Sequence, residues 1–317
     1  NSFRASEKMT NKLVVWFVVL FLAGCGRSEV EFALIGDSPY GDANVLKYER
    51  LIDDVNRSNV SWVIHLGDMK NGRSSCSDEK FRSLFELNSK FEIPFVLTPG
   101  DNDWFDCRRE SAGDWGRMDR LNKLRKLFFT EGHPLIDETQ SKTSVYSEFV
   151  ENALWVRKNI LFSTVHLVGV SGREGGLDLH GYVQDAAIEW LQTIFRRARE
   201  ENVNAVFIAT QADFFPYSVE PDWLRLECPN CNFIRKYYEP FYKALKNELS
   251  TYDNQVLLAV GDTHIFRVDK PLYDNGELVT NFTRVEVFGS EQVHWVKVTL
   301  SESDGVFVIE QEFVEGN

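Results

Sequence analysis

The chain has 317 residues, of which 43% are hydrophobic and 26% are charged. This composition is typical of a globular protein and supplies enough apolar side chains for one large α/β domain. The formal net charge of -13 at pH 7 argues against a general nucleic-acid-binding surface, which requires clustered Lys and Arg. We therefore expect a folded protein without a nucleic-acid partner.

The first 25 residues are predicted to be a leader and not part of the fold. Lys12 precedes a short apolar run that ends in Leu22-Ala23-Gly24-Cys25. This pattern is typical of a secretory signal, and the run is too short for a comfortable membrane span. Its end resembles a bacterial lipobox, which predicts lipid attachment at Cys25 and an exported protein anchored at the periplasmic or cell-surface side of a membrane. The alternative is an uncleaved anchor helix with an incidental Cys.

The rest of the chain, residues 26–317, contains no internal repeat or linker and is predicted to form a single domain. Its first part alternates apolar runs with amphipathic stretches. The predicted order is a strand at 31–35, a helix at 44–57, a strand at 61–66, a helix at 78–89 with Asp78 as its N-cap, and a strand at 94–97. This β-α-β-α-β order favours a layered α/β fold.

Further helices and strands are predicted in the second part of the chain. Helical periodicity indicates helices at 117–129, 184–201 and 234–249. Apolar runs predict strands at 145–150, 154–156, 159–170, 204–209, 255–260, 278–287, 293–300 and 306–313. A stretch rich in Pro and aromatic residues, 214–233, is expected to be irregular.

Four predicted strands end in a turn that carries a carboxylate. The turns are Gly36-Asp37, Gly67-Asp68, Gly100-Asp101 and Gly261-Asp262, and His264 follows the last of them. One Gly-Asp pair is ordinary turn chemistry, but four at strand exits are expected to converge at one edge of an open sheet. Oxygen ligands with one His suit divalent cations such as Mn, Fe, Zn, Mg or Ca. Two such cations about 4 Å apart could activate a bridging hydroxide for attack on phosphorus.

In these turns the chain resembles the calcineurin-like metallophosphoesterases. That family carries, in order, Asp-x-His, Gly-Asp, Gly-Asn-His-Asp/Glu, a lone His after a strand, and Gly-His-x-His. The corresponding segments here are Asp37-Ser38-Pro39, Gly67-Asp68, Gly100-Asp101-Asn102-Asp103, Gln211 and Gly261-Asp262-Thr263-His264. The resemblance implies a four-layer α/β/β/α sandwich, in which helices flank two mixed sheets and the site lies at the strand C-termini.

The resemblance implies metal ligands, some by identity and others by substitution. Asp37, the bridging Asp68 and His264 match the family directly. The other expected ligands supply oxygen where the family has Asn or His, and they are Asp101, Gln211 and Asp262. Pro39 stands where a His ligand is expected, so one protein ligand is lost. The exchange of imidazole for oxygen shifts the expected preference from Zn and Fe toward Mn, Mg or Ca.

The same comparison predicts catalytic roles for Asp68, Asn102 and His264. Asn102 stands where the family has the His that helps to protonate the leaving group, and no adjacent side chain replaces that acid. Loss of this general acid is expected to lower the rate about 10²- to 10⁴-fold for poor leaving groups. Activated aryl esters or diphosphates should suffer least.

The resemblance thus predicts a metal-dependent phosphoric ester hydrolase, which acts on a phosphate mono- or diester through metal-bound hydroxide and is expected to be a monomer. Tyr40, Lys70 and Asn102 are expected to contact the substrate phosphate, the alternative for Lys70 being a solvated loop charge. A different class, a metal- or ligand-binding lipoprotein without turnover, is favoured by Pro39, Gln211 and Asn102.

Several neighbouring residues are open to two interpretations. Arg267, Asp269 and Lys270 either orient His264 or form a structural ion pair. Asp42 and Asp103 are either additional ligands or turn residues.

Export would place the remaining cysteines in a compartment that permits disulfides. Cys76 and Cys107 follow the second and third acidic turns, so a disulfide between them is expected at the rim of the site. Cys228 and Cys231 have C-x-x-C spacing without a second such pair. A local loop disulfide is favoured there over a redox dithiol or half a zinc knuckle.

Overall fold

The computed structural model describes residues 30–142, 144–169, 177–215, 231–301 and 306–317. The predicted leader, including Cys25, lies outside these ranges, as does Cys228. Among the helices in these ranges, none combines the length and the apolar character that crossing a bilayer requires.

The first of the two large sheets has five strands and mixed direction. Their order is β14 (Phe307–Glu312), β13 (Trp295–Leu300), β1 (Val30–Ile35), β2 (Val63–His65) and β3 (Phe95–Leu97). β1, β2 and β3 are parallel, whereas β13 runs antiparallel to both β1 and β14. The C-terminal ends of β1, β2 and β3 therefore lie at the same edge, which is where the first three acidic turns begin.

The second sheet has seven strands and is also mixed. Their order is β4 (Glu138–Thr139), β5 (Ala153–Arg157), β6 (Ile160–Thr164), β7 (Ala205–Ala209), β8 (Gln255–Val260), β12 (Phe282–Glu286) and β9 (Arg267–Asp269). The four strands from β6 to β12 are parallel, and the three outer strands are antiparallel to their neighbours. A separate hairpin pairs β10 (Tyr273–Asp274) with β11 (Glu277–Leu278).

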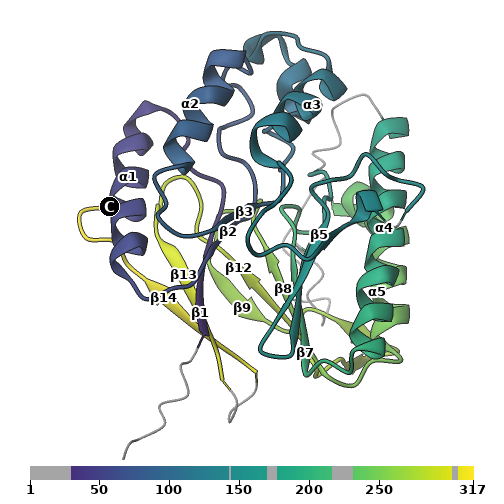
Figure 1. Cartoon of the computed structure of the whole chain (residues 1–317). Helices are drawn as coiled ribbons and strands as arrows, with labels where there is room; N and C mark the ends of the chain where they lie inside the picture. The colour runs from purple at the N-terminus through teal and green to yellow at the C-terminus, as the bar shows by residue number, and fades with distance from the viewer. Residues whose placement is uncertain (1–29, 143, 170–176, 216–230, 302–305) are drawn as a thin grey trace, which may run out of the picture.

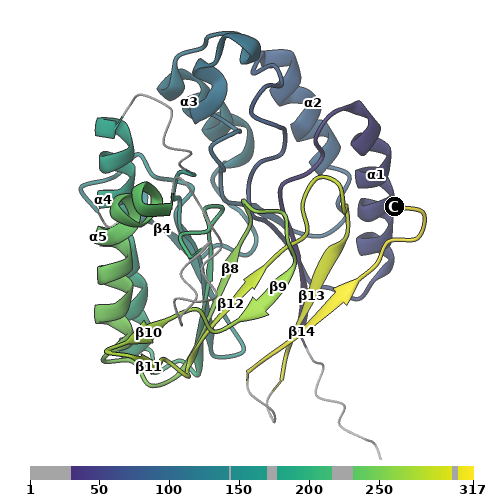
Figure 2. The ribbon, with the colours of Figure 1, turned by 180° about the vertical axis from the view of Figure 1, so that it is seen from behind.

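Helices cover the outer faces of the two sheets, as Figures 1 and 2 show from opposite sides. On one side lie α1 (Asp42–Arg57), α2 (Asp78–Asn88) and α3 (Arg117–Phe128), and on the other lie α4 (Leu177–Glu200) and α5 (Cys231–Leu249). Short 3₁₀ segments complete the connections, and they are η1 (Phe105–Arg108), η2 (Glu110–Ala112) and η3 (Gln140–Lys142). The predicted four-layer α/β/β/α sandwich is confirmed.

The alternation of side chains in β1 explains why the layers stack in this way. Phe32 and Leu34 point into the core between the two sheets, and Ala33 and Ile35 point toward α1. Both faces are apolar because a central parallel strand is covered on both sides. In the inter-sheet core the ring of Phe32 lies edge-on to Phe162, with centroids 5.5 Å apart.

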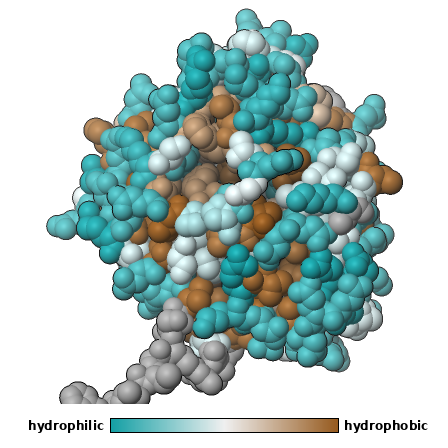
Figure 3. Space-filling view, in the orientation of Figure 1, coloured by the Kyte–Doolittle hydropathy of each residue, from teal (hydrophilic) through white to brown (hydrophobic). Residues whose placement is uncertain are grey.

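Some predicted elements are wrong in type or extent. Residues 145–150, predicted as a strand, form turns, and the strand predicted at 159–170 ends at Thr164. The N-cap of α2 is Ser77 and not Asp78, because the Ser77 side chain accepts a hydrogen bond from the Lys80 N–H. In the orientation of Figure 1, hydrophilic side chains cover most of the surface and hydrophobic ones gather in recesses between them (Figure 3).

Candidate active site and metal centre

Loops from both sheets meet at the C-terminal edge of the parallel strands. The Asp37 N–H donates to Gly67 O at 3.0 Å, which joins the loops after β1 and β2. The Asp262 N–H donates to Asp37 Oδ2, also at 3.0 Å, and thereby links the loop after β8 to the loop after β1. The Gly261 N–H donates to Gln211 O at 3.0 Å. The structure thus brings together the turns in which the sequence placed the ligands.

Four of the six predicted ligands have left-handed backbone conformations. The φ angles are 48° at Asp37, 56° at Asp68, 80° at Asp262 and 63° at His264. Side chains other than Gly rarely adopt this region, and such residues cluster where the surrounding structure forces them into place for function.

Two glycines allow the backbone to approach these carboxylates closely. A Cβ atom at Gly100 would lie 1.9 Å from Asp68 Oδ1, and one at Gly261 would lie 2.4 Å from Asp37 Oδ2. Any side chain at either position would collide with a predicted ligand. Glycine is therefore required at positions 100 and 261 because the loops pack closely against each other, and not only because of the turn conformation.

Asp68 lies at the centre of a cluster of hydrogen bonds with two other predicted site residues. Its Oδ2 accepts from Tyr40 Oη at 3.0 Å and from Asn102 Nδ2 at 2.5 Å, and its Oδ1 accepts from the Asn102 N–H at 3.0 Å. Asn102 Nδ2 also lies 2.9 Å from Tyr40 Oη. The structure therefore places Tyr40 and Asn102 directly on the predicted bridging carboxylate.

The concentration of carboxylates changes the acidity of the site. Burial raises the pKa of Asp68 well above its usual range, and the charges of Asp101, Asp103, Asp37 and Asp262 raise it further. Burial, followed by the nearby carboxylates, also raises the pKa of Tyr40. Tyr40 therefore stays protonated near neutral pH and acts as a hydrogen-bond donor. A bound cation would offset the repulsion among the acids.

His264 completes the group from the side of the second sheet. Its Nε2 lies 3.6 Å from Asp37 Oδ1, and its ring lies edge-on to Tyr40 with centroids 5.2 Å apart. Burial lowers the pKa of His264, but the Asp37 carboxylate outweighs that effect and raises it above the usual value. The side chain is 33% exposed, so the imidazole lies where the site opens to solvent.

Several polar side-chain atoms at this edge have no hydrogen-bond partner among the described residues. These atoms are Asp37 Oδ1 and both polar atoms of the Gln211 side chain, and the two residues are 0% exposed. Buried polar groups are rarely left unpaired unless they serve a ligand. The set of oxygen donors with one imidazole fits a hard divalent cation such as Mn or Mg.

The described residues do not form a finished metal cage. Within them, no three His, Cys, Asp or Glu side chains are arranged so that they could hold a metal ion. At Asp68, Oδ2 is already engaged by Tyr40 and Asn102. Binding of a cation there would require both donors to turn away.

Asp103 proves to be a structural anchor and not an additional ligand. Its Oδ2 accepts from the N–H groups of Asp68 at 2.7 Å and Gly100 at 2.9 Å, and its Oδ1 accepts from Met69 N–H at 2.8 Å. The residue is 1% exposed. One carboxylate thus joins the loop after β2 to the loop after β3.

Lys70 lies beneath the site surface, where it is 1% exposed, so it is not a solvated loop charge. Its Nζ donates to the carbonyl oxygens of Asn71 at 3.4 Å and Ser74 at 3.3 Å. Burial lowers the pKa of the ammonium group, and the carboxylates led by Asp103 and Asp68 oppose that shift. Its contact with substrate stays a prediction.

A further carboxylate near the site was not identified from the sequence. Glu286, at the end of β12, is 0% exposed and bonds to the loop that carries His264. A signal was present, because Arg284 and Glu286 are the two charged residues of the strand predicted at 278–287.

The rim of the site contains the expected disulfide. Cys76 and Cys107 are bonded, with Cα atoms 5.7 Å apart, and both residues are 0% exposed. The bond joins the loop after β2 to η1, which follows the third acidic turn. The pairing predicted for Cys228 with Cys231 lies outside the described residues.

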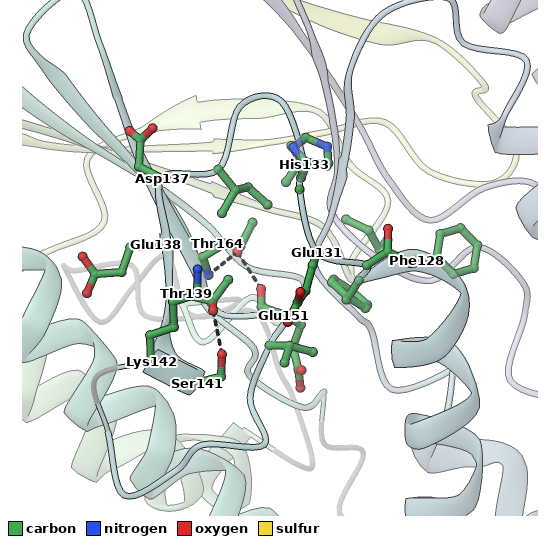
Figure 4. A pocket seen from close by; sticks show the side chains of 18 residues that line it. Phe128, Glu131, His133, Asp137, Glu138, Thr139, Ser141, Lys142, Glu151 and Thr164 are labelled. Carbon is green, nitrogen blue, oxygen red and sulfur yellow. Dashed lines mark hydrogen bonds between the residues drawn. The ribbon is translucent and has the colours of Figure 1, made fainter.

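A separate pocket of about 370 Å³ lies between the end of α3 and strands β3, β4 and β5 (Figure 4). Its wall combines acids with basic side chains, and these residues are Glu131, Asp137, Glu138, Glu151, His133 and Lys142. None of the predicted ligands lines the pocket. The pocket is therefore a poor candidate for the phosphoester site.

Comparison with known proteins identifies the family of the chain. A family model described as calcineurin-like phosphoesterase matches residues 30–190. The match includes Asp37, Asp68 and Asp101 and ends before Gln211, Asp262 and His264. No curated protein sequence matches this chain.

Three solved structures share the fold, and two of them are described as phosphatases. A dimetal phosphatase from Danio rerio is 12% identical with a TM-score of 0.55, covering 90% of this chain and 96% of that protein. PhoD is 10% identical with a TM-score of 0.57, covering 89% of this chain and 68% of its own. A purple acid phosphatase from yellow lupin (Lupinus luteus) seeds is 13% identical with a TM-score of 0.51, covering 91% of this chain and 52% of its own. At these identities the likeness concerns the fold alone.

Proposed function

Because this chain belongs to the calcineurin-like phosphoesterase family, we propose that it hydrolyses a phosphate mono- or diester with the help of one or two divalent metal ions. The observation that carries the proposal is the convergence of four strand-exit carboxylates, three from the first sheet and one from the second, beside the unpartnered side chain of Gln211.

Residues from both sheets would hold the metal. The proposed ligands are Asp37, Asp68, Asp101, Gln211, Asp262 and His264. A divalent cation bound there polarises a phosphoryl oxygen and lowers the pKa of water near it. The oxygen-rich set favours Mn, Mg or Ca over Zn or Fe.

Tyr40 and Asn102 would bind the phosphate through the groups that now contact Asp68. The Tyr40 hydroxyl and the Asn102 amide both donate to Asp68 Oδ2. If Asp68 Oδ2 turned toward a cation, the Tyr40 hydroxyl and the Asn102 amide would be free to donate to phosphoryl oxygens. Because these oxygens are negatively charged, the hydrogen bonds would be charge-assisted.

Position 102 supplies no side chain that could protonate the leaving group. An amide cannot transfer a proton, and the raised pKa of Tyr40 makes its hydroxyl a weak acid. We therefore expect a preference for esters whose leaving group departs without protonation, such as aryl esters and diphosphates.

A second candidate function is binding without turnover. It is supported by the saturation of Asp68 Oδ2 with two donors and by Pro39 in place of a ligand. In that case the site would bind a metal or an anion without hydrolysing an ester.

The proposed location is the periplasmic or cell-surface face of a membrane. The proposal rests on the apolar run before Cys25, and it takes residues 26–317 as the folded, monomeric domain. Mass spectrometry of the mature N-terminus would test it, because a diacylated Cys25 is expected and an unmodified one would contradict the anchor.

The test of the proposed function is hydrolysis by the metal-free protein after addition of Mn, Mg, Ca, Zn or Fe. We expect turnover of an aryl phosphate or an aryl phosphodiester only with an added divalent ion, and most with Mn or Mg. Bound metal without turnover of any ester would favour the binding protein.

Variants of the site make this test specific. Asp68→Asn and His264→Ala should each abolish metal-dependent hydrolysis. The control is Glu86→Gln, an exposed carboxylate on α2 that should leave the rate unchanged. Full activity in Asp68→Asn would show that the assignment of the site is wrong.

A further inference from the structure

Strand β12 carries two charged side chains into the protein interior beside the Gly261–His264 loop. Arg284 and Glu286 are both 0% exposed, and because they are two residues apart they lie on the same face of the strand. Buried charges are rarely retained unless each is paired and hydrogen-bonded. Their partners show what the pair does.

The Glu286 carboxylate binds the backbone on both sides of His264. Its Oε1 accepts from the Thr263 N–H at 3.1 Å and from the Ile265 N–H at 3.4 Å. The Thr263 hydroxyl donates to the same oxygen. The two residues adjacent to His264 are therefore held by a single buried atom.

Arg267 closes the arrangement from the other side of the carboxylate. Its Nε donates to Glu286 Oε2 at 2.5 Å, and its Nη2 donates to Thr263 Oγ1 at 2.9 Å. Thr263 thus donates to Glu286 and accepts from Arg267. Of the two interpretations of Arg267, the contacts favour the one in which it helps to orient His264.

Arg284 connects the same network to the loop that carries Gln211. Its Nη1 lies 2.9 Å from Asp213 Oδ1 and 2.8 Å from Asp213 Oδ2, and Asp213 follows Gln211 by two residues. Arg267 Nη2 also lies 3.5 Å from Asp213 Oδ2. One set of buried charges therefore contacts both loops that bring ligands from the second sheet.

The backbone at His264 requires such support. Its φ of 63° lies in the left-handed region, and the loop packs so closely that a Cβ at Gly289 would lie 2.3 Å from His264 Cγ. A non-Gly residue keeps this conformation only when its surroundings enforce it. The hydrogen bonds of Glu286 to both neighbouring residues provide that enforcement.

We propose that Glu286 is a positioning residue that sets where the His264 imidazole lies relative to Asp37 and, through it, the affinity of the site for metal. The statement about metal rests on the proposed function, whereas the statement about the loop does not. Glu286 itself contacts neither the proposed metal nor the substrate.

The first test uses the metal-free protein and amide hydrogen exchange. In Glu286→Gln the exchange of the 261–266 segment should accelerate at least tenfold. The neutral amide is a weaker acceptor for the Thr263 and Ile265 N–H groups, and its NH2 group faces the Arg267 donor that now binds Oε2. The matched control is Glu248→Gln on α5, whose carboxylate is 12% exposed and pairs with Arg199 at 2.6 Å. Exchange in the 261–266 segment should not change in this control.

The second test measures Mn binding by calorimetry and by pulsed electron paramagnetic resonance, which detects the coupling of a ligating imidazole nitrogen to Mn. Glu286→Gln should weaken Mn binding 10–100-fold, as loss of a partner that orients a ligand commonly does, and should reduce the nitrogen coupling. Glu248→Gln should retain both.

The possible outcomes separate the inference from the proposed function. Unchanged exchange in a folded Glu286→Gln protein would overturn the inference, and so would a loosened loop with unchanged Mn affinity and nitrogen coupling. Failure of the unaltered protein to bind any of Mn, Mg, Ca, Zn or Fe would overturn the proposed function, while the exchange result would still decide whether Glu286 holds the loop. If Glu286→Gln does not fold, Arg267→Met, at a side chain that is 26% exposed, replaces it in both tests with the same criteria.

Discussion

At the scale of single residues, the most informative substitution restores an imidazole at position 102. In Asn102→His we expect the rate on an alkyl phosphate to rise by about 10-fold to 100-fold, because an imidazole near its pKa can protonate a poor leaving group. The rate on an aryl phosphate should change little. The measurement is the ratio of kcat values for the two substrates.

A nearby substitution provides the control for this experiment. Asn71→His places an imidazole in the loop after β2, where Asn71 Oδ1 accepts only a local bond from Arg73 N–H at 3.0 Å. It should leave the ratio of kcat values unchanged. An equal response in both variants would show that the imidazole at position 102 does not act as the acid.

The side chain of Gln211 allows a test of whether a residue that binds metal lowers the stability of the metal-free protein. Both of its polar atoms are buried without a partner among the described residues, which costs about 1–3 kcal/mol. Gln211→Leu has a similar shape and should raise the unfolding free energy of the metal-free protein by that order. The same change should weaken metal binding, as measured by calorimetry.

Gln140 is the matched control, because it is also 0% exposed but has partners. Its Nε2 donates to Ala186 O at 2.9 Å, and its Oε1 accepts from Asn152 Nδ2 at 2.7 Å. Gln140→Leu should therefore lower the unfolding free energy. Destabilisation by both substitutions would contradict the interpretation of Gln211 as an unsatisfied ligand.

His65 should make stability depend on pH. Burial lowers its pKa from 6.5 to about 4, and the Gly67 N–H donates to Nδ1 at 3.1 Å, so protonation there would break a bond. Between pH 6.5 and 4 the unfolded chain binds the proton and the folded one does not. The contribution of His65 to stability is therefore lost on acidification, by an amount on the order of 3 kcal/mol.

Urea unfolding at pH 7.5 and at pH 5 measures this effect. In His65→Gln the group that titrates is absent, so its unfolding free energy should fall less between the two pH values. An identical fall in the variant and the unaltered protein would assign the pH dependence to other groups.

At the scale of elements, the Cys76–Cys107 bond should stabilise the rim formed by the loop after β2 and η1. It closes a loop with a sequence separation of 31 residues. Replacing both residues by Ser should lower the unfolding free energy by about 2–4 kcal/mol, because the unfolded chain loses a constraint. Urea unfolding checks this, and the reduced protein should match the double variant.

The elements that the sequence predicted well are those with a regular pattern and a clear end. β8 has the predicted bounds, and the strands before Asp37, Asp68 and Asp101 lie where expected. The strand predicted at 145–150 is wrong because its apolar side chains share no buried sheet face: Val145 is 87% exposed, whereas Phe149 is buried against a helix. Phe149 packs on Tyr182 of α4 with ring centroids 5.7 Å apart, which an alternating pattern does not distinguish from a strand.

The site was predictable to the extent that its chemistry is local in sequence. Each Gly-Asp pair follows its own strand, so the carboxylates could be found from motif and order. The roles of the supporting residues could not be predicted, because Asp103 and Glu286 accept hydrogen bonds from backbone N–H groups of other loops. The depth of Lys70 depends likewise on how separate loops pack over it.

At the scale of the whole molecule, the residues matched by the family model do not include all the strands of either large sheet. Residues 30–190 include β1 but not β13, and β6 but not β7. A fragment with these bounds would expose the inter-sheet core and an unpaired edge on each sheet. We expect it to lack a cooperative urea transition, as monitored by circular dichroism; a cooperative transition would show that the fragment is independently stable.

The pairing of β1 also has a consequence for the order in which the protein can assemble. Val30 pairs with Leu300, so the second residue of this contact is synthesised 270 positions after the first. Contacts between such distant parts of a chain form slowly, because a long loop must close before they add stability. His264 likewise reaches Asp37 only after most of the chain exists. A growing chain would therefore carry Asp37, Asp68 and Asp101 well before it could place the imidazole beside them, and the capacity to bind metal would be acquired late, close to the completion of folding.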